Sequence, residues 1–295
     1  DLRSASFFAD FYLWMRYSVP SGDTETAAQL EKLEFMNGKA DAREELDRKV
    51  VRGETYVCWR VSGTFHFDTQ LRAYPFDTQA LDIVIEQPLL EETDCVFKED
   101  LASYGRSAIP PALWGAKEGL DIPEFTLKRT ERRIVSSTYK TDFGDLDRKQ
   151  PTTTYSRFIF SMKFARDFMP YIFKILIPLL VILAMAYLVF FLPPKEIQSA
   201  SGLGISALLS AIAFNISIAQ NLPEVGYLVV SDKFFIGTYL ILLLTLGQSV
   251  GCYAWHDRDE SDPRPAQWLR RCRYIFPVLY VSMFAYLLTQ ASFTR

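Results

Sequence analysis

The sequence is poor in the residues that build metal centres. Its 295 residues include only two histidines, His66 and His256, which lie far apart in the chain, and four cysteines, none of which belongs to a CxxC pair. A metal site built from cysteine and histidine is therefore not expected. Cys58 and Cys95 are able to form a disulfide in an oxidising compartment, and the sequence does not decide whether they do.

Other features are missing as well. The chain has no Gly-rich tract, no internal repeat and no basic patch large enough to suggest a nucleic-acid partner, and its formal net charge is −3. No signal peptide precedes Asp1, so in an exported protein we expect Asp1 to be the start of a processed or trimmed chain. Residues 1–165 hold almost all the charge, whereas residues 168–293 are mostly apolar.

The charged half predicts an antiparallel β-sandwich, because short runs of strand formers alternate with turn signals. The runs are residues 7–17, 33–36, 56–67, 80–86, 96–97, 125–135 and 155–164. In the first run, alternation places Phe11 and Leu13 on the face that we expect to be core. Asn37-Gly38 predicts a turn, and residues 39–53 are expected to be charged and solvated.

The apolar half predicts four membrane-spanning helices at about residues 168–192, 197–220, 232–255 and 274–293. Pro193-Pro194 should end the first of them. The loop after the third is rich in arginine, with Arg258, Arg264, Arg270, Arg271 and Arg273. The positive-inside rule places that loop in the cytoplasm, so residues 1–165 and the C-terminus should both lie outside the cell membrane.

The second span carries a stripe that a lipid-facing helix should not have. Helical spacing places seven residues on one face: Gln198, Gly202, Ser206, Leu209, Ala213, Ile216 and Gln220. Lipid offers no hydrogen bonds to Ser or Gln, so this face should turn elsewhere. Several copies of the helix around an axis would enclose an ion path. The stripe contains no Asp, Glu, His or Cys, which argues against an intramembrane enzyme.

We expect the middle of the stripe to be the gate. Leu209, Ala213 and Ile216 would form a narrow apolar ring from which water withdraws, so that a hydrated ion cannot pass. Ser206, Gly202 and Gln198 would line the inner half, with Gln198 as the narrowest polar ring. The alternative is that these residues are ordinary helix-packing residues.

The order of several motifs resembles the pentameric ligand-gated ion channels, the Cys-loop receptor superfamily. The motifs are the turn Tyr74-Pro75-Phe76-Asp77-Thr78-Gln79, Arg166 before the first span, Pro178 within it, Ile212-Ala213-Phe214-Asn215-Ile216, and Asn221-Leu222-Pro223. Phe67 and Leu81 stand where the animal branch has its loop cysteines, so the chain is most similar to prokaryotic members. Relative to the family, the first strand of the sandwich is expected to be missing.

The resemblance implies a homopentamer of five identical subunits around a central pore. Residues 1–165 would form an extracellular ligand-binding domain and residues 166–295 a four-helix transmembrane bundle, in a bacterial inner membrane. The implied partners are membrane lipids, permeant ions and an unknown small ligand, with no cofactor. The protein would be a ligand-gated ion channel. The alternatives are a non-conducting membrane receptor or a four-helix transporter with an extracellular sensor domain.

The resemblance also implies roles for individual residues. Asp77 and Arg166 match an ion pair that couples the two domains, which Asp1 and Pro223 would join. A Glu at the inner end of the pore helix favours cations in this family, so Glu196, with Gln198, suggests cation selectivity. The ligand-binding candidates, for which strand packing is the alternative, are Tyr12, Trp14, Arg16, Phe35, Tyr139, Phe143 and Tyr155.

An acidic run leaves a further possibility open. Glu91, Glu92 and Asp94 supply oxygen ligands of the kind that Ca²⁺ prefers, so weak Ca²⁺ binding and modulation are one interpretation. A solvated acidic loop is the other.

Overall fold

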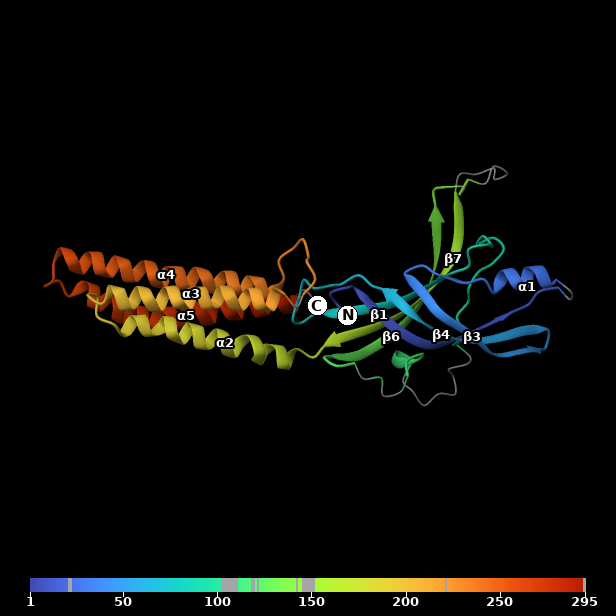
Figure 1. Cartoon of the computed structure of the whole chain (residues 1–295), viewed down its shortest axis with the longest axis horizontal. Helices are drawn as coiled ribbons and strands as arrows, with labels where there is room; N and C mark the ends of the chain where they lie inside the picture. Colours follow the sequence, from blue (N-terminus) through green and yellow to red (C-terminus); the bar gives the residue numbers. More distant parts are fainter. Residues whose placement is uncertain are drawn as a thin grey trace. The chain divides into compact units, whose positions relative to one another are not determined.

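The computed structural model describes residues 1–20, 23–101, 111–117, 120, 122–141, 143–144, 152–220 and 222–293. Asn221, one of the residues that carried the family resemblance, lies outside them. The chain divides into two compact units, the first made of residues 1–69 and 79–165 and the second of residues 70–78 and 166–295. Figure 1 shows that the strands gather in the first unit and the long helices in the second.

The first unit contains two antiparallel sheets. Its strands are β1 (Ser6–Tyr17), β2 (Glu34–Phe35), β3 (Gly38–Val51), β4 (Glu54–His66), β5 (Thr78–Glu86), β6 (Phe125–Tyr139) and β7 (Thr153–Arg166). The strand order is β1-β4-β3 in one sheet and β2-β5-β7-β6 in the other. Two short helices, α1 (Thr24–Leu30) and η2 (Pro111–Leu113), accompany them.

The two sheets share one apolar core, which confirms the predicted sandwich. Phe65 of β4 packs with Ile83 and Ile85 of β5, so side chains from both sheets meet. Phe11 and Leu13 of β1 pack against this core, as the alternation of their strand predicted. The core of the first unit therefore follows from the period of two in β1 and β4.

Two segments of this unit differ from the sequence prediction in their secondary structure. Residues 39–53 are charged and mostly exposed, as predicted, but most of them form a strand that was not predicted, since β3 pairs with β4 along its whole length, from Gly38 opposite Phe65 to Val51 opposite Glu54. Nearly all its side chains are exposed, so the strand has no apolar alternation to signal it. Residues 96–97 form no strand, although Phe97 packs against the core.

The second unit contains α2 (Phe168–Leu188), the short helix η3 (Val189–Phe191), α3 (Ile197–Ala219), α4 (Val230–Arg258) and α5 (Arg264–Phe293). Buried residues of α2, α3, α4 and α5 join in one apolar cluster. The last helix begins ten residues before the predicted start of the fourth span at residue 274, because the arginine-rich stretch before it is also helical.

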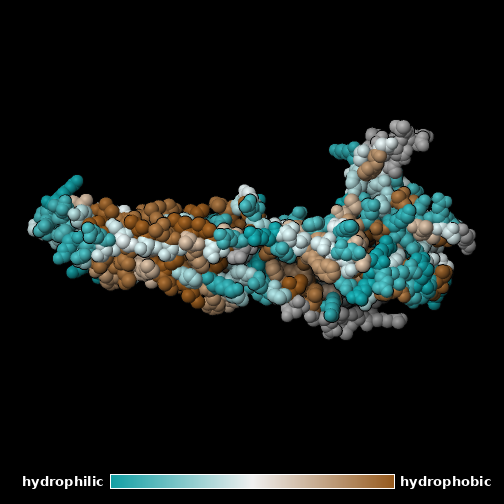
Figure 2. Space-filling model, in the orientation of Figure 1, coloured by the Kyte–Doolittle hydropathy of each residue, from teal (hydrophilic) through white to brown (hydrophobic). Residues whose placement is uncertain are grey.

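Three of these helices, taken over their described residues, are long and apolar enough to cross a membrane. They are Phe168–Phe191, Ile197–Ala219 and Val230–Arg258, and α5 is not among them. Hydrophobic residues cover much of the visible surface of this unit in Figure 2. Such a surface is unstable in water and suits lipid or further protein.

Candidate functional site

The stripe predicted on α3 lies on the uncovered face of the helix. All seven of its residues are exposed: Gln198, Gly202, Ser206, Leu209, Ala213, Ile216 and Gln220. Leu209 is 60% exposed and Ile216 is 53% exposed. Spacing alone therefore placed these residues on one face correctly, and the subunit by itself leaves that face without cover.

The opposite face of α3 is built from small residues. Ala200, Gly204, Ala207 and Ala211 are buried, and they allow the helix to approach its neighbours closely. A Cβ added at Gly204 would lie 3.2 Å from Leu246 Cδ1 of α4, whereas one added at Gly202 would meet nothing within 4 Å. The two glycines, one half-turn apart, therefore have different surroundings.

Aromatic side chains hold α3 to α4 at the level of the predicted gate. The rings of Phe214 and Phe235 contact each other edge to face, with 5.7 Å between their centroids. The hydroxyl of Tyr239 donates a hydrogen bond to the carbonyl oxygen of Ala211 at 3.5 Å. These contacts fix the rotation of α3 about its own axis and so keep the stripe on the uncovered face.

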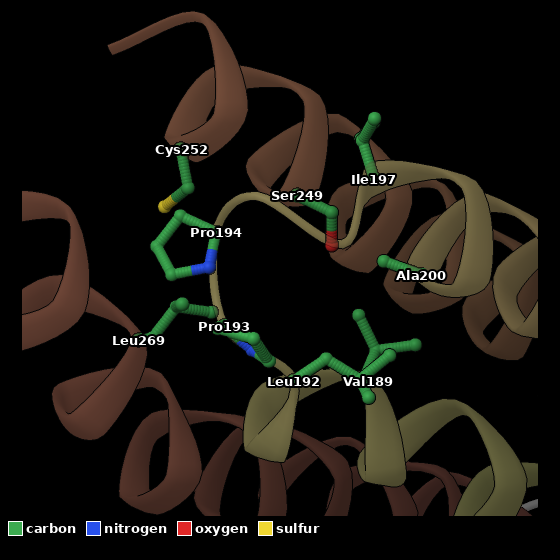
Figure 3. A pocket seen from close by; sticks show the side chains of 9 residues that line it. All are labelled: Val189, Leu192, Pro193, Pro194, Ile197, Ala200, Ser249, Cys252 and Leu269. Carbon is green, nitrogen blue, oxygen red and sulfur yellow. The ribbon is translucent and has the colours of Figure 1, made fainter. Parts of the chain in front are cut away.

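The linker before α3 encloses a small, mostly apolar pocket (Figure 3). The pocket is lined by Val189, Leu192, Pro193, Pro194, Ile197, Ala200, Ser249, Cys252 and Leu269. Pro194 lies beside the thiol of Cys252 in this view. The linker thus packs against α4 and α5 and positions the start of α3, where Glu196 and Gln198 are both exposed.

A shielded ion pair joins the turn at residues 70–78 to the end of β7. Arg166 donates to Asp77 through two hydrogen bonds, Nε to Oδ1 at 2.7 Å and Nη2 to Oδ2 at 3.0 Å. The side chains of Arg166 and Asp77 are 1% and 0% exposed. This is the pair that the family resemblance implied.

Two tyrosines flank the guanidinium of Arg166. Its carbon lies 5.1 Å from the ring centres of both Tyr74 and Tyr171, and Nη1 donates to the Tyr171 hydroxyl at 3.2 Å. Burial alone would lower the pKa of Arg166, but the hydrogen bonds and charge of Asp77 outweigh it and raise that pKa. Sequence reasoning missed the two tyrosines, although Tyr74 belongs to the turn motif.

The loop between α3 and α4 packs on the same turn through Tyr227. The Tyr227 hydroxyl accepts a hydrogen bond from the backbone N–H of Leu71 at 3.2 Å, and the guanidinium of Arg72 lies 4.8 Å from the centre of its ring. Pro223 is half-buried in this loop. The carboxylate of Asp1 accepts from the Arg3 amide and the Ser4 hydroxyl, so its part in the cluster stays a prediction.

Three of the seven ligand-binding candidates come together in the first unit. The ring of Tyr139 lies 5.4 Å from that of Phe143 and 5.9 Å from that of Tyr155, centre to centre. Two charged residues complete the group. Arg157 donates to the Tyr139 hydroxyl and, through Nε, to Glu86, and the Tyr139 hydroxyl donates to the other Glu86 oxygen.

The other four candidates lie elsewhere on the sandwich. Trp14 and Arg16 both donate to the carboxylate of Asp100, at 3.1 and 2.6 Å. Tyr12 is exposed on β1, and Phe35 packs edge-on against Phe65 in the core. For Phe35, the structure therefore supports the strand-packing alternative that the sequence left open.

The acidic run does not converge on a common point. Among the described residues, no three His, Cys, Asp or Glu side chains are placed to share one metal ion, so Glu91, Glu92 and Asp94 form no such group. Glu92 accepts a hydrogen bond from the Ser136 hydroxyl. Modulation by Ca²⁺ stays a prediction without a cluster to support it here. Cys58 and Cys95 are both free thiols.

Comparison with known protein families finds a match for the helices of the second unit. Residues 175–279 match the neurotransmitter-gated ion-channel transmembrane region. This segment of the second unit is similar to the membrane region of that family. The matched segment begins within α2 and ends within α5, so it includes the whole of α3 and its stripe.

Several curated ion channels resemble the chain at low sequence identity. A proton-gated ion channel of Gloeobacter violaceus is 27% identical over 71% of this chain and 52% of its own length. A pH-sensitive chloride channel 2 of Anopheles gambiae is 25% identical, over 63% of this chain and 28% of its own length. An acetylcholine-gated chloride channel subunit of Caenorhabditis elegans is 23% identical over 78% of this chain and 46% of its own length.

The chain spans about half or less of the length of these curated relatives. They are ion channels and not enzymes, and their names include both a proton-gated channel and chloride channels. These similarities therefore do not by themselves decide which ion would pass.

Proposed function

We propose that this chain is one subunit of a ligand-gated ion channel whose pore is lined by α3. The observation that carries the proposal is the stripe, which is exposed along the whole helix and contains no charge. A lone subunit would present the Ser and Gln of the stripe to lipid, at a cost of unsatisfied hydrogen bonds. Copies arranged around an axis would place the stripe against water instead.

Five identical subunits are proposed, in line with the family that the chain resembles. We propose that the assembly lies in a cell membrane, namely a bacterial inner membrane. In it α5 would be the fourth span, and both termini would lie outside. Chemical cross-linking of the purified protein tests the assembly directly. A ladder that ends at five subunits would support the proposal, and a stable monomer or dimer would contradict it.

The gate is proposed at Leu209, Ala213 and Ile216. Narrow rings of these apolar side chains would exclude water and so block ions in the closed state. Replacing Leu209 with Ala widens and weakens the ring, so we expect current in planar bilayers without added ligand. The matched control is Leu208→Ala, because Leu208 packs into the bundle beside the stripe. If no current appears under any ligand, pH or Ca²⁺ condition and Leu209→Ala adds none, the channel proposal fails.

Cation selectivity is proposed, with Glu196 and Gln198 at the inner mouth. Glu196 is the acidic residue next to the exposed stripe, and its carboxylate accepts from the Ser199 hydroxyl at 3.4 Å. In asymmetric NaCl we expect a reversal potential near that of Na⁺, shifted toward that of Cl⁻ by Glu196→Gln. The chloride channels among the relatives make anion passage the competing outcome. A wild-type reversal potential at the Cl⁻ value would contradict the proposed cation selectivity. The proposal that the protein is an ion channel would still stand.

Coupling to the gate is proposed to run through the Asp77–Arg166 pair and Tyr227. The pair and Tyr227 lie on the same 70–78 turn or contact it, and Tyr227 belongs to the loop that connects the pore helix to α4. A movement of the turn would therefore be transmitted to the outer end of α3. The group of Tyr139, Phe143 and Tyr155 is the proposed site for the small ligand.

A further inference from the structure

The turn predicted at Asn37-Gly38 carries the chain from one sheet of the sandwich to the other. The strand before it, β2, pairs with β5, and the strand after it, β3, pairs with β4. The passage is tight, because a Cβ added at Gly38 would lie 2.4 Å from the carbonyl oxygen of Thr64. This crossing brings residue 37 next to strands of both sheets.

The Asn37 side chain uses its donors and its acceptor to join the two sheets. Nδ2 donates to the carbonyl oxygen of His66 on β4 at 2.8 Å and to that of Asp82 on β5 at 2.7 Å. Oδ1 accepts from the backbone N–H of Val84 on β5 at 3.0 Å. This arrangement needs two donor hydrogens and one acceptor oxygen on a short side chain, which is what an Asn amide provides. We refer to these three hydrogen bonds as the Asn37 clamp.

The clamp holds the two ends of a segment that leaves the first unit. Residues 70–78 depart after residue 69, and the chain re-enters the first unit at residue 79. His66 lies three residues before the exit, and Asp82 lies three residues after the return. The sequence has no cysteine between Cys58 and Cys95, so no disulfide joins these two ends. The clamp therefore bridges the base of the segment without a covalent bond.

We propose that Asn37 is a positioning residue for the 70–78 turn, to which the proposed coupling route runs. Its clamp keeps the two ends of the turn at a fixed spacing, so that a movement of the sandwich is passed on to the turn. Without the clamp, the end of β4 and the start of β5 would separate more easily, and the movement would be absorbed there. This role of Asn37 rests on the coupling route proposed above, and it does not depend on where the ligand binds or which ion passes.

Hydrogen–deuterium exchange of the purified full chain in detergent, read by mass spectrometry, tests the proposal. The backbone N–H groups of Leu71, Tyr74 and Phe76 are hydrogen-bonded, so peptides that cover residues 67–78 report on the order of the turn. A hydrogen bond contributes about a fivefold change in an equilibrium, so Asn37→Ala, which removes the clamp, should speed exchange of these peptides about tenfold or more. A bond that serves only the local chain would change exchange at Val84 alone.

Two further variants make the exchange result decisive. Asn37→Asp keeps the size of the side chain and the acceptor for the Val84 N–H but has no donor, so it should speed exchange of the same peptides. It also carries the test if Asn37→Ala does not fold. The matched control is Thr130→Val, because the buried Thr130 hydroxyl on β6 donates to the carbonyl oxygen of Trp114 at 2.6 Å. This control should lower Tm and leave exchange of residues 67–78 unchanged.

A double variant tests whether the clamp acts on the loop after the pore helix. Tyr227→Phe removes the hydrogen bond from the Leu71 N–H, and it should lower Tm less in the Asn37→Ala background, where the turn is already released. Additive Tm losses, unchanged exchange of residues 67–78 in the Asn37 variants, or an equal increase in Thr130→Val would each overturn the proposal. The current of Leu209→Ala is measured separately. If that variant conducts while the exchange is unchanged, only the role of Asn37 fails and the channel proposal stands.

Discussion

Replacing Arg166 with Met tests how strongly the ion pair to Asp77 stabilises the second unit. Met has a similar length but no charge, so the Asp77 carboxylate would stay shielded without its partner. Breaking a buried pair from one side costs about 3–5 kcal/mol. Each kcal/mol lowers the Tm of a protein of this size by about 2–4 °C, so we expect a drop of about 6–20 °C.

The assay is thermal unfolding of the purified protein in detergent, followed by tryptophan fluorescence. A double variant, Asp77→Asn/Arg166→Met, removes both charges at once. We expect it to lose less than the sum of the two single variants, because no uncompensated charge remains. A double loss equal to that sum would mean that the two side chains act independently, which contradicts the reasoning.

The chain offers a matched control for the same chemistry at the surface. Arg60 donates to Asp10 through Nε at 3.0 Å and Nη2 at 2.7 Å, nearly the geometry of the buried pair. The side chains of Arg60 and Asp10 are 54% and 38% exposed. Water replaces a lost partner at such a site, so Arg60→Met should leave Tm almost unchanged. Equal Tm shifts at Arg60 and Arg166 would refute the claim that burial sets the cost.

Two further predictions use the same Tm assay. Gly204→Leu should lower Tm by about 2–12 °C, since overpacking against Leu246 costs about 1–3 kcal/mol. Gly202→Leu should leave Tm unchanged and reduce the ion current. The reverse pattern would mean that α3 is rotated about its axis. Tyr227→Phe removes the hydrogen bond from the Leu71 N–H, which contributes about 1 kcal/mol, so Tm should fall by about 2–4 °C. An unchanged Tm would show that water replaces this hydrogen bond.

Periodicity predicted those elements whose two faces meet different surroundings. In β1, Phe11 and Leu13 face the core while their neighbours do not, so a period of two is visible in the sequence. In β3 both faces are exposed, and the strand is held by its backbone pairing with β4. Such pairing depends on a partner strand and leaves no periodic pattern in the residues themselves, which is why residues 39–53 were predicted to be solvated but not to form a strand.

The same distinction separates what could be foreseen in the candidate site from what could not. The face of α3 was visible because all its residues belong to one helix, where spacing fixes direction. The tyrosines around Arg166 come from two places, Tyr74 in the turn and Tyr171 in α2, and spacing within one element says nothing about contacts between them. Only the family resemblance brought Asp77 and Arg166 together, and it gave no reason to include their aromatic neighbours.

Helices α3 and α5 each bury one side in the bundle, but their exposed sides differ in polarity. Each helix turns one side to the bundle, through small residues on α3 and through Leu269, Phe276 and Tyr280 on α5. The free side of α5 is apolar beyond Tyr274 and therefore suits lipid. The free side of α3 carries Ser206 and both glutamines, which lipid would leave without hydrogen-bond partners. If α3 faces water, as we propose, a shared axis between subunits would supply that water, and Leu209 and Ile216 would interrupt it.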